Sequence, residues 1–203
     1  MPAASPSSFA IDVPDALLER ARAGEHAALE QLYRWFERPV FTLALRMCGD
    51  RESAADVLQD TMLKVFGHLG GFRRRDGCPF WGWLRQVAVN EALMRLRHQR
   101  RFAQDVALED DHWLQDEGPL PSAAADAARL QRALAALPAV TRSVLWLYHA
   151  EGYTHDEIAV LMDRSASFSK SQVARGTRRL RQLLEAAPAS TTHATLVPES
   201  RHA

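Results

Sequence analysis

The side chains most suited to binding another molecule are the basic residues of one stretch near the C-terminal end. Residues 164–184 contain six Lys or Arg side chains and no Asp or Glu. A helix with so much uncompensated positive charge repels itself unless an anion, such as the phosphate backbone of a nucleic acid, neutralises it. The charge pattern therefore favours DNA binding over the alternative of a surface helix that is only well solvated.

A helix-turn-helix is the arrangement that would position this basic stretch. Thr154 can cap a first helix, and Glu157, three residues later, completes a capping box. Residues 163–167 are rich in turn formers, and a second amphipathic pattern with Val173 on its apolar side follows them. This layout predicts that the second helix lies in a DNA major groove.

A second candidate surface combines aromatic and basic residues between Phe80 and Arg101. Trp81 and Trp83 begin this expected helix, and four arginines fill its end: Arg95, Arg97, Arg100 and Arg101. Aromatic rings stack on unpaired bases, which is worth ~1–3 kcal/mol per base, while arginines follow the phosphates. The structural alternative is that the rings form core and the arginines complement the helix dipole. We expect Phe80 and Trp83 in the core and leave Trp81 open.

A third candidate surface is a ridge on the helix expected over residues 52–68. Asp56, Asp60 and Lys64 are spaced four residues apart, and Gln59 lies on the same polar side. The spacing alone does not distinguish a binding ridge from an ordinary solvated face.

The distribution of charge says more than its sum. The chain has 203 residues and a formal net charge of zero. Residues 73–101 carry eight arginines and two acids, whereas residues 102–126 carry seven acids and no Lys or Arg. Such segregation predicts a basic binding surface followed by an acidic linker.

The composition argues against several other classes of protein. Cys48 and Cys78 lack the spacing of a metal site or a disulfide framework, and the eight histidines are scattered, so we expect no metal and no cofactor. We identify no nucleophile–base pair and no glycine-rich phosphate loop, hence no catalytic residues. The start lacks the pattern of a signal peptide, and no apolar run approaches the ~20 residues of a membrane span. We therefore expect a cytoplasmic protein that is not inserted in a membrane.

Hydrophobic periodicity predicts an all-α fold of two small helical domains. Apolar residues recur at three- and four-residue steps along most of the chain, and no sustained alternation indicates a strand. We expect Pro39 to kink or split the second helix. The expected organisation is a disordered N-terminus at 1–13, a helical bundle at 14–101, a flexible acidic linker at 102–122, a helix-turn-helix domain at 123–186 and a flexible tail at 187–203.

Three blocks resemble the bacterial RNA polymerase sigma factors of the sigma-70 family, in the compact extracytoplasmic-function (ECF) group. ESAADVLQDTMLKVF (52–66) is similar to region 2.2, and FWGWLRQVAVNEALMRLRHQRR (80–101) is similar to regions 2.3–2.4. LPAVTRSVLWLYHAEGYTHDEIAVLM (137–162) is similar to region 4, with its Leu-Pro, its Arg and its Glu-Gly. The resemblance covers residues 15–185 and implies promoter-specific transcription initiation without catalysis by this chain.

The resemblance also implies a role for each candidate surface. Residues matching polymerase-facing positions, which contact the clamp helices of the largest subunit, are Asp56, Gln59 and Asp60. Asn90 matches the asparagine of a pocket for a base flipped from the promoter −10 element, and an amide can hydrogen-bond a base edge. The residues that could accompany Asn90 at the −10 element are Trp81, Arg85, Arg95 and Arg97. Those expected at the −35 element are Lys170, Ser171, Gln172, Ala174, Arg175 and Arg178.

The implied partners are RNA polymerase core, including the clamp helices and the β flap, promoter DNA and an anti-sigma factor. One departure concerns the turn before the recognition helix, where Ser167, Phe168 and Ser169 replace the usual Gly-Thr-Val. Gln172 stands where an Arg is common and would prefer adenine, unless it never reaches a base. The alternative function is a helix-turn-helix regulator that binds duplex DNA without polymerase.

Overall fold

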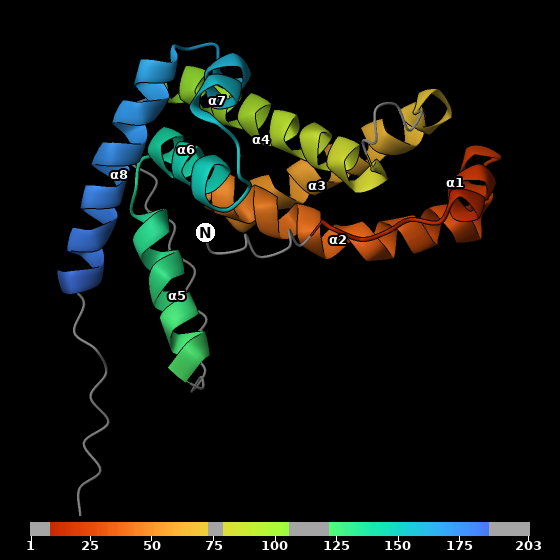
Figure 1. Cartoon of the computed structure of the whole chain (residues 1–203), viewed down its shortest axis with the longest axis horizontal. Helices are drawn as coiled ribbons and strands as arrows, with labels where there is room; N and C mark the ends of the chain where they lie inside the picture. The colour runs from red at the N-terminus through yellow and green to blue at the C-terminus, as the bar shows by residue number, and fades with distance from the viewer. Residues whose placement is uncertain (1–8, 73–78, 106–121, 187–203) are drawn as a thin grey trace, which may run out of the picture.

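The computed structural model describes residues 9–72, 79–105 and 122–186, and all the regular elements in these ranges are helical (Figure 1). The predicted all-α fold is confirmed. The elements are α1 (Asp15–Arg22), α2 (His26–Cys48), α3 (Arg51–His68), the 3₁₀ turn η1 (Leu69–Gly71), α4 (Phe80–Asp105), α5 (Ser122–Ala135), α6 (Ala139–His149), α7 (His155–Met162) and α8 (Ala166–Ala186).

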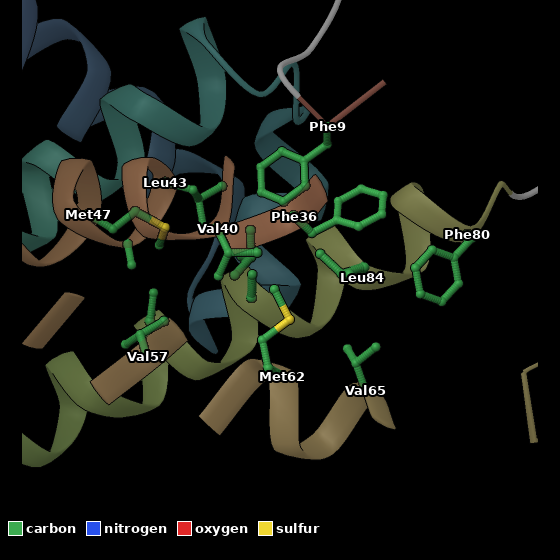
Figure 2. Close-up of a cluster of buried hydrophobic side chains, with 14 of the residues drawn as sticks. Phe9, Phe36, Val40, Leu43, Met47, Val57, Met62, Val65, Phe80 and Leu84 are labelled. Atoms are coloured by element: carbon green, nitrogen blue, oxygen red, sulfur yellow. The ribbon is translucent and has the colours of Figure 1, made fainter. Parts of the chain in front are cut away.

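The first half of the chain packs α2, α3 and α4 against one another around a shared apolar core. Figure 2 shows Phe36, Val40 and Leu43 of α2 converging with Val57 and Met62 of α3. Each of these side chains is buried, as the three- and four-residue spacing of apolar positions requires. The core holds α3 and α4 against each other.

Local signals set the ends of α2 and α3. Gly49 ends α2 in the left-handed region at φ 95°, where glycine carries no steric penalty. Asp50 then caps α3 by accepting a hydrogen bond from the Ser53 amide at 2.7 Å. Pro39 lies inside α2, which continues through it and is not split.

The N-terminal segment differs from the expectation of disorder over residues 1–13. Phe9 is 0% exposed and lies in the core, as Figure 2 shows, and Val13 is 2% exposed in the same cluster. Burying two large apolar side chains stabilises the segment, so the expectation does not hold for residues 9–13. The first eight residues lie outside the described ranges.

The helices next to the acidic segment extend further than expected. Helix α4 continues to Asp105, beyond the boundary expected at residue 101, and α5 begins at Ser122. The expected linker at 102–122 therefore begins and ends within helices. Residues 106–121 and the expected tail at 187–203 lie outside the described ranges.

The second half contains the predicted helix-turn-helix. Thr154 and Glu157 form the capping box at the start of α7, with the Thr154 hydroxyl accepting from the Glu157 amide at 3.2 Å. Asp163 ends α7 at φ 52°, a left-handed conformation that Asp tolerates better than most residues. Ser165 then caps α8 by accepting from the Phe168 amide at 3.2 Å.

The two halves share apolar contacts. Val144, Leu147 and Ile158 of the second half are fully buried in the same cluster as the core of α2, α3 and α4. A second, smaller cluster formed by Leu134, Leu137 and Leu145 supports α8. In Figure 1, α6 and α7 lie against the first half, while α5 and α8 extend away from it.

Within residues 9–72, 79–105 and 122–186, no helix is long and apolar enough to cross a bilayer.

Candidate functional site

The ridge predicted on α3 is present and largely exposed. Gln59 and Asp60 are exposed, and Leu63 beside them is 64% exposed, an unusual position for a large apolar side chain. Asp56 is half-buried and pairs with Arg95 of α4 at 2.6 Å. The ridge therefore presents three exposed side chains to a protein partner: the Asp60 carboxylate, the Gln59 amide and the apolar Leu63.

An ion pair between the exposed Lys64 of α3 and the buried Glu91 of α4 joins the two helices beside this ridge. The Lys64 ammonium donates to both carboxylate oxygens of Glu91 at 2.7 Å. The Glu91 side chain is 8% exposed, while that of Lys64 is 46% exposed. The buried apolar side chains of α4, such as Leu84 and Ala92, leave Asn90 on the solvent side, and the pair at the adjacent Glu91 holds α4 against α3 at this level.

Asn90 is exposed on the outer face of α4. Its side-chain oxygen accepts a hydrogen bond from Gln86, one turn earlier, at 3.3 Å. Met94, one turn later, is 52% exposed. This face therefore presents an amide that can hydrogen-bond a base, next to an apolar side chain that can contact it.

Trp81 and Arg85 form a stacked pair at the start of α4, where the second half of the chain meets it. The Arg85 guanidinium lies over the rings of Trp81 and Tyr153, at 5.7 and 5.1 Å from the centroids. It also donates to the Glu151 carboxylate at 3.3 Å and to the Glu151 carbonyl at 3.0 Å. Trp81, which the sequence did not assign to either the core or a binding surface, is therefore half-buried. The guanidinium of the neighbouring Arg85 is already paired with Glu151.

The remaining arginines expected beside Asn90 point to different neighbours. Arg95 faces α3 through its pair with Asp56, whereas Arg97 donates to the carbonyl of Leu161 in α7 at 2.6 Å. The candidate −10 residues therefore do not form one open surface in this structure. Asn90 faces solvent, while Arg85 and Arg97 contact the second half. Of the other aromatics, Phe80 is in the core and Trp83 is half-buried, stacked on Phe72.

The basic helix α8 carries most of its predicted DNA-binding residues on exposed positions. Gly176 faces inward, and Ser169 is buried with a hydrogen bond to the ring of His155 at 3.0 Å. Exposed positions on the opposite side are Lys170, Ser171, Ala174, Arg175 and Arg178. Figure 1 shows α8 as a long helix whose length extends away from the rest of the molecule.

Gln172 differs from the other predicted residues of α8. It is half-buried, and its side-chain oxygen accepts a hydrogen bond from the Thr141 hydroxyl of α6 at 2.7 Å. One turn later Gly176 allows α6 to approach so closely that a Cβ there would lie 2.6 Å from Thr141 and 2.7 Å from Leu145. These contacts fix how α8 is presented, so Gln172 positions the helix in this structure.

Local contacts accommodate the residues that replace the usual Gly-Thr-Val at the start of α8. Ser167 is exposed in the first turn of α8, and Phe168 packs against the main apolar cluster. Ser169 is fully buried, and the hydrogen bond to His155 satisfies its hydroxyl group.

Sequence reasoning assigned no role to the contacts that join the two halves. The Arg142 guanidinium donates to the carbonyls of Met47, at 3.2 Å, and of Cys48, both at the end of α2. It also donates to the carbonyls of Ala135, the last residue of α5, and of Leu137 just after that helix. Burial lowers the pKa of Arg142, because it disfavours the charged guanidinium. The hydrogen bonds to these carbonyls offset the free-energy cost of burying that charge. The sequence feature that could have indicated these contacts is the position of Arg142 within the apolar pattern of a helix.

Within the described residues, no group of three or more His, Cys, Asp or Glu side chains is placed to hold a metal ion.

Comparison with known proteins identifies the two halves. Residues 32–102 match the family model "Sigma-70 region 2", and residues 127–180 match "Sigma-70, region 4". The protein SigM of Mycobacterium tuberculosis, an ECF RNA polymerase sigma factor, is 32% identical over 168 residues, which covers 83% of each chain. This chain belongs to the sigma-70 family, in its ECF group. It is therefore a sigma factor, which directs promoter-specific transcription.

Other relatives agree with this assignment. RNA polymerase sigma-H factor of Pseudomonas aeruginosa is 29% identical over 180 residues, covering 83% of this chain and 92% of the relative. The protein CarQ of Myxococcus xanthus is 32% identical over 167 residues, covering 82% and 95%. We use region 2 for the first half of this sigma factor and region 4 for the second.

A solved structure shares the fold. It is the sigma factor RpoE in complex with the anti-sigma factor NepR from Bartonella quintana, with a TM-score of 0.54 and 24% identity. The match covers 78% of this chain and 98% of that chain.

Proposed function

We propose that the sigma factor divides promoter recognition between its two regions and binds polymerase mainly through region 2. The ridge of Asp56, Gln59 and Asp60 is the surface for the clamp helices of the largest subunit. Its exposure, together with the exposed Leu63, supports this assignment. Region 4 contacts the β flap, and catalysis belongs to the polymerase.

Asn90 is the residue that captures a flipped base of the melted −10 element. The observation that carries this proposal is an exposed amide on α4, next in the chain to Glu91, whose pair with Lys64 joins α4 to α3. Trp81, Arg85, Arg95 and Arg97 flank the base and its phosphates once their present contacts are released. A flipped base presents its Watson–Crick edge, and an amide offers both a donor and an acceptor to it.

Helix α8 of region 4 binds the −35 duplex in the major groove. The exposed residues that contact the DNA are Lys170, Ser171, Ala174, Arg175 and Arg178, while Gln172 supports the helix through Thr141. Linking the two readers in one polymerase complex raises the effective concentration of each at its DNA element, so each can be weak by itself.

An anti-sigma factor that covers the polymerase-facing surfaces is a further partner in this proposal, and the cytoplasm is the site of action. The support is the family and the fold shared with a sigma factor solved with its anti-sigma factor. The anti-sigma factor would compete with polymerase for region 2.

The test is run-off transcription with polymerase core on fragments of the source genome. We expect discrete start sites with the wild type, reduced roughly tenfold or more by Asn90→Ala, since one bidentate base contact is worth about 1–3 kcal/mol. Gln31→Ala is the matched control, because it removes an exposed side-chain amide on α2, away from every proposed contact surface.

The outcomes separate the candidate functions. Start sites insensitive to Asn90→Ala would remove this residue from the base pocket. No start sites, together with a footprint of the protein alone on duplex DNA, would favour the polymerase-independent regulator.

A further inference from the structure

We propose that Met94 is a specificity-determining residue: it contacts the nucleotide next to the flipped base and favours thymine there, through the methyl group of that base. This inference rests on the proposed function of Asn90. It adds a second position of the −10 element at which region 2 discriminates between bases, by apolar contact instead of hydrogen bonding.

The exposed surface of α4 around Asn90 is a narrow strip. Between residues 90 and 98 the exposed side chains are Asn90, Met94, Arg97 and His98, and the residues between them are buried or half-buried. Asn90 and Arg97 lie nearly in line along the helix, because seven residues make almost two turns, and Met94 lies between them. A strand that runs from Asn90 to a phosphate contact at Arg97 therefore passes over Met94.

Met94 is the one exposed large apolar side chain among the described side chains of α4, and it is 52% exposed. A single exposed apolar residue is common on protein surfaces, so its exposure alone does not assign it a role. Its position does, because it lies one turn after the amide that is proposed to capture a base.

The two turns that flank Asn90 differ in chemistry. One turn earlier, the half-buried Gln86 donates a hydrogen bond to the Asn90 side-chain oxygen at 3.3 Å. One turn later, Met94 offers a thioether and a methyl group. A nucleotide on the Gln86 side of the captured base therefore meets a polar group, whereas a nucleotide on the Met94 side meets an apolar one.

The spacing along α4 assigns Met94 to a neighbouring nucleotide. Four residues of α-helix advance about 6 Å along the axis. Consecutive nucleotides of a stretched single strand are separated by a similar distance. A strand whose flipped base reaches Asn90 therefore brings its next base close to Met94.

Thymine is the base that an apolar side chain can select. Its C5 methyl group is the only apolar substituent on the edges of the four DNA bases. The methionine side chain is flexible and polarisable, so it can adapt to the position of that methyl group. Contact between the two removes apolar surface from water, which favours thymine over a base without the methyl group.

The test compares thymine with deoxyuridine, which differs from it only by lacking the methyl group. The promoter is one whose start site is established with the wild type, and its flipped position is the one at which Asn90→Ala abolishes base preference. Each of the two neighbouring positions of the non-template strand carries thymine or deoxyuridine in turn. The two templates compete for full-length protein bound to polymerase core, and the ratio of their transcripts is measured.

We expect the wild type to favour the thymine template about threefold or more at one of the two neighbouring positions, as burial of one methyl group predicts. Met94→Ala should bring this ratio close to one, whereas Met94→Leu, which keeps an apolar side chain, should retain most of it. Any effect of the methyl group on duplex melting is the same for every variant, so comparison between variants removes it.

Val160→Ala is the matched control, because it shortens an exposed apolar side chain on α7, in region 4. It should retain the wild-type ratio. Equal ratios in wild type and Met94→Ala at both positions would overturn the inference. So would a loss of transcription in Met94→Ala that is the same on both templates, because Met94 would then act without the methyl group.

Failure of the proposed function gives a different result in the same assay. Asn90→Ala would then leave base preference unchanged at every position of the −10 element. An effect of Asn90→Ala, combined with a thymine-to-deoxyuridine ratio that does not depend on Met94, would remove only the inference about Met94.

Discussion

Lys64 and Glu91 join two helices by a pair in which one ammonium serves both oxygens of a nearly buried carboxylate, at 2.7 Å each. Lys64 lies four residues after Asp60 of the proposed polymerase ridge on α3, and Glu91 is adjacent to the proposed base-capturing Asn90 on α4. The pair therefore fixes the orientation of one surface relative to the other.

Lys64→Met should destabilise the protein, because it leaves the Glu91 carboxylate buried without its ammonium. We expect a loss of about 1–3 kcal/mol in the free energy of unfolding, measured with urea. The double variant with Glu91→Gln should recover part of that loss, since no unpaired charge remains buried. Additive losses in the double variant would show that the two side chains do not interact energetically.

Gly176→Ala should weaken −35 binding by changing how α8 is presented. The new Cβ would lie 2.6 Å from Thr141 and 2.7 Å from Leu145, so α6 and α8 must move apart. We expect −35 duplex affinity to fall roughly tenfold, with the loss measured on the polymerase complex. Gly67→Ala is the matched control, because Gly67 is also helical and a Cβ there meets nothing within 4 Å. Equal duplex affinity in the two variants would contradict the prediction.

Cys48 should react slowly with thiol reagents in the native protein. Burial raises its pKa to about 12, and the nearby Asp50 carboxylate adds to this, although Arg142 and Arg95 oppose it. At pH 8 the thiolate is then roughly one part in ten thousand. The measurement is the rate of reaction with a disulfide reagent in a Cys78→Ser background, with and without guanidinium chloride. A native rate close to the denatured rate would show that the end of α2 is open to solvent.

The pH dependence of stability should carry a contribution from Glu151. Burial raises the pKa of this carboxyl above its ordinary 4.5, against the opposing effects of Arg85 and the Trp146 hydrogen bond. The folded protein then binds this proton more tightly than the unfolded chain does. The contribution to stability is complete below pH 4.5 and is lost as pH rises through the raised pKa.

Glu151→Gln removes this titration while keeping a hydrogen-bond acceptor. The wild-type free energy of unfolding, relative to that of Glu151→Gln, should fall as pH rises from about 4 to 7. Urea unfolding at a series of pH values measures the difference. A relative stability that rises with pH would mean that the attraction of Arg85 outweighs burial.

The features that the sequence predicted well depend on residues close together in the chain. The capping box of Thr154 and Glu157 spans three residues, and its local geometry follows from residue type. The apolar periodicity of α2 and α3 likewise specifies which side is buried. Pattern reasoning therefore located the helix-turn-helix and the all-α fold.

The interface between regions could not be predicted in this way. Arg85 and Glu151 are 66 positions apart, and Arg142 and Met47 are 95 apart. Both Arg142 and Glu151 lie in the block that resembles region 4, but a block of sequence carries no information about a distant partner. Likewise, Gln172 has the side chain of a base-contacting residue, and only the approach of α6 through Gly176 shows that Thr141 engages it.

The tight approach at Gly49 has a consequence for how this part of the chain can vary among related proteins. Gly49 has φ 95°, and a Cβ there would lie 2.6 Å from the Arg142 guanidinium carbon. No other residue therefore fits at position 49 while Arg142 donates to the carbonyls of Met47 and Cys48. A relative with a side chain at position 49 should also lack the arginine at position 142, so the two positions should change together.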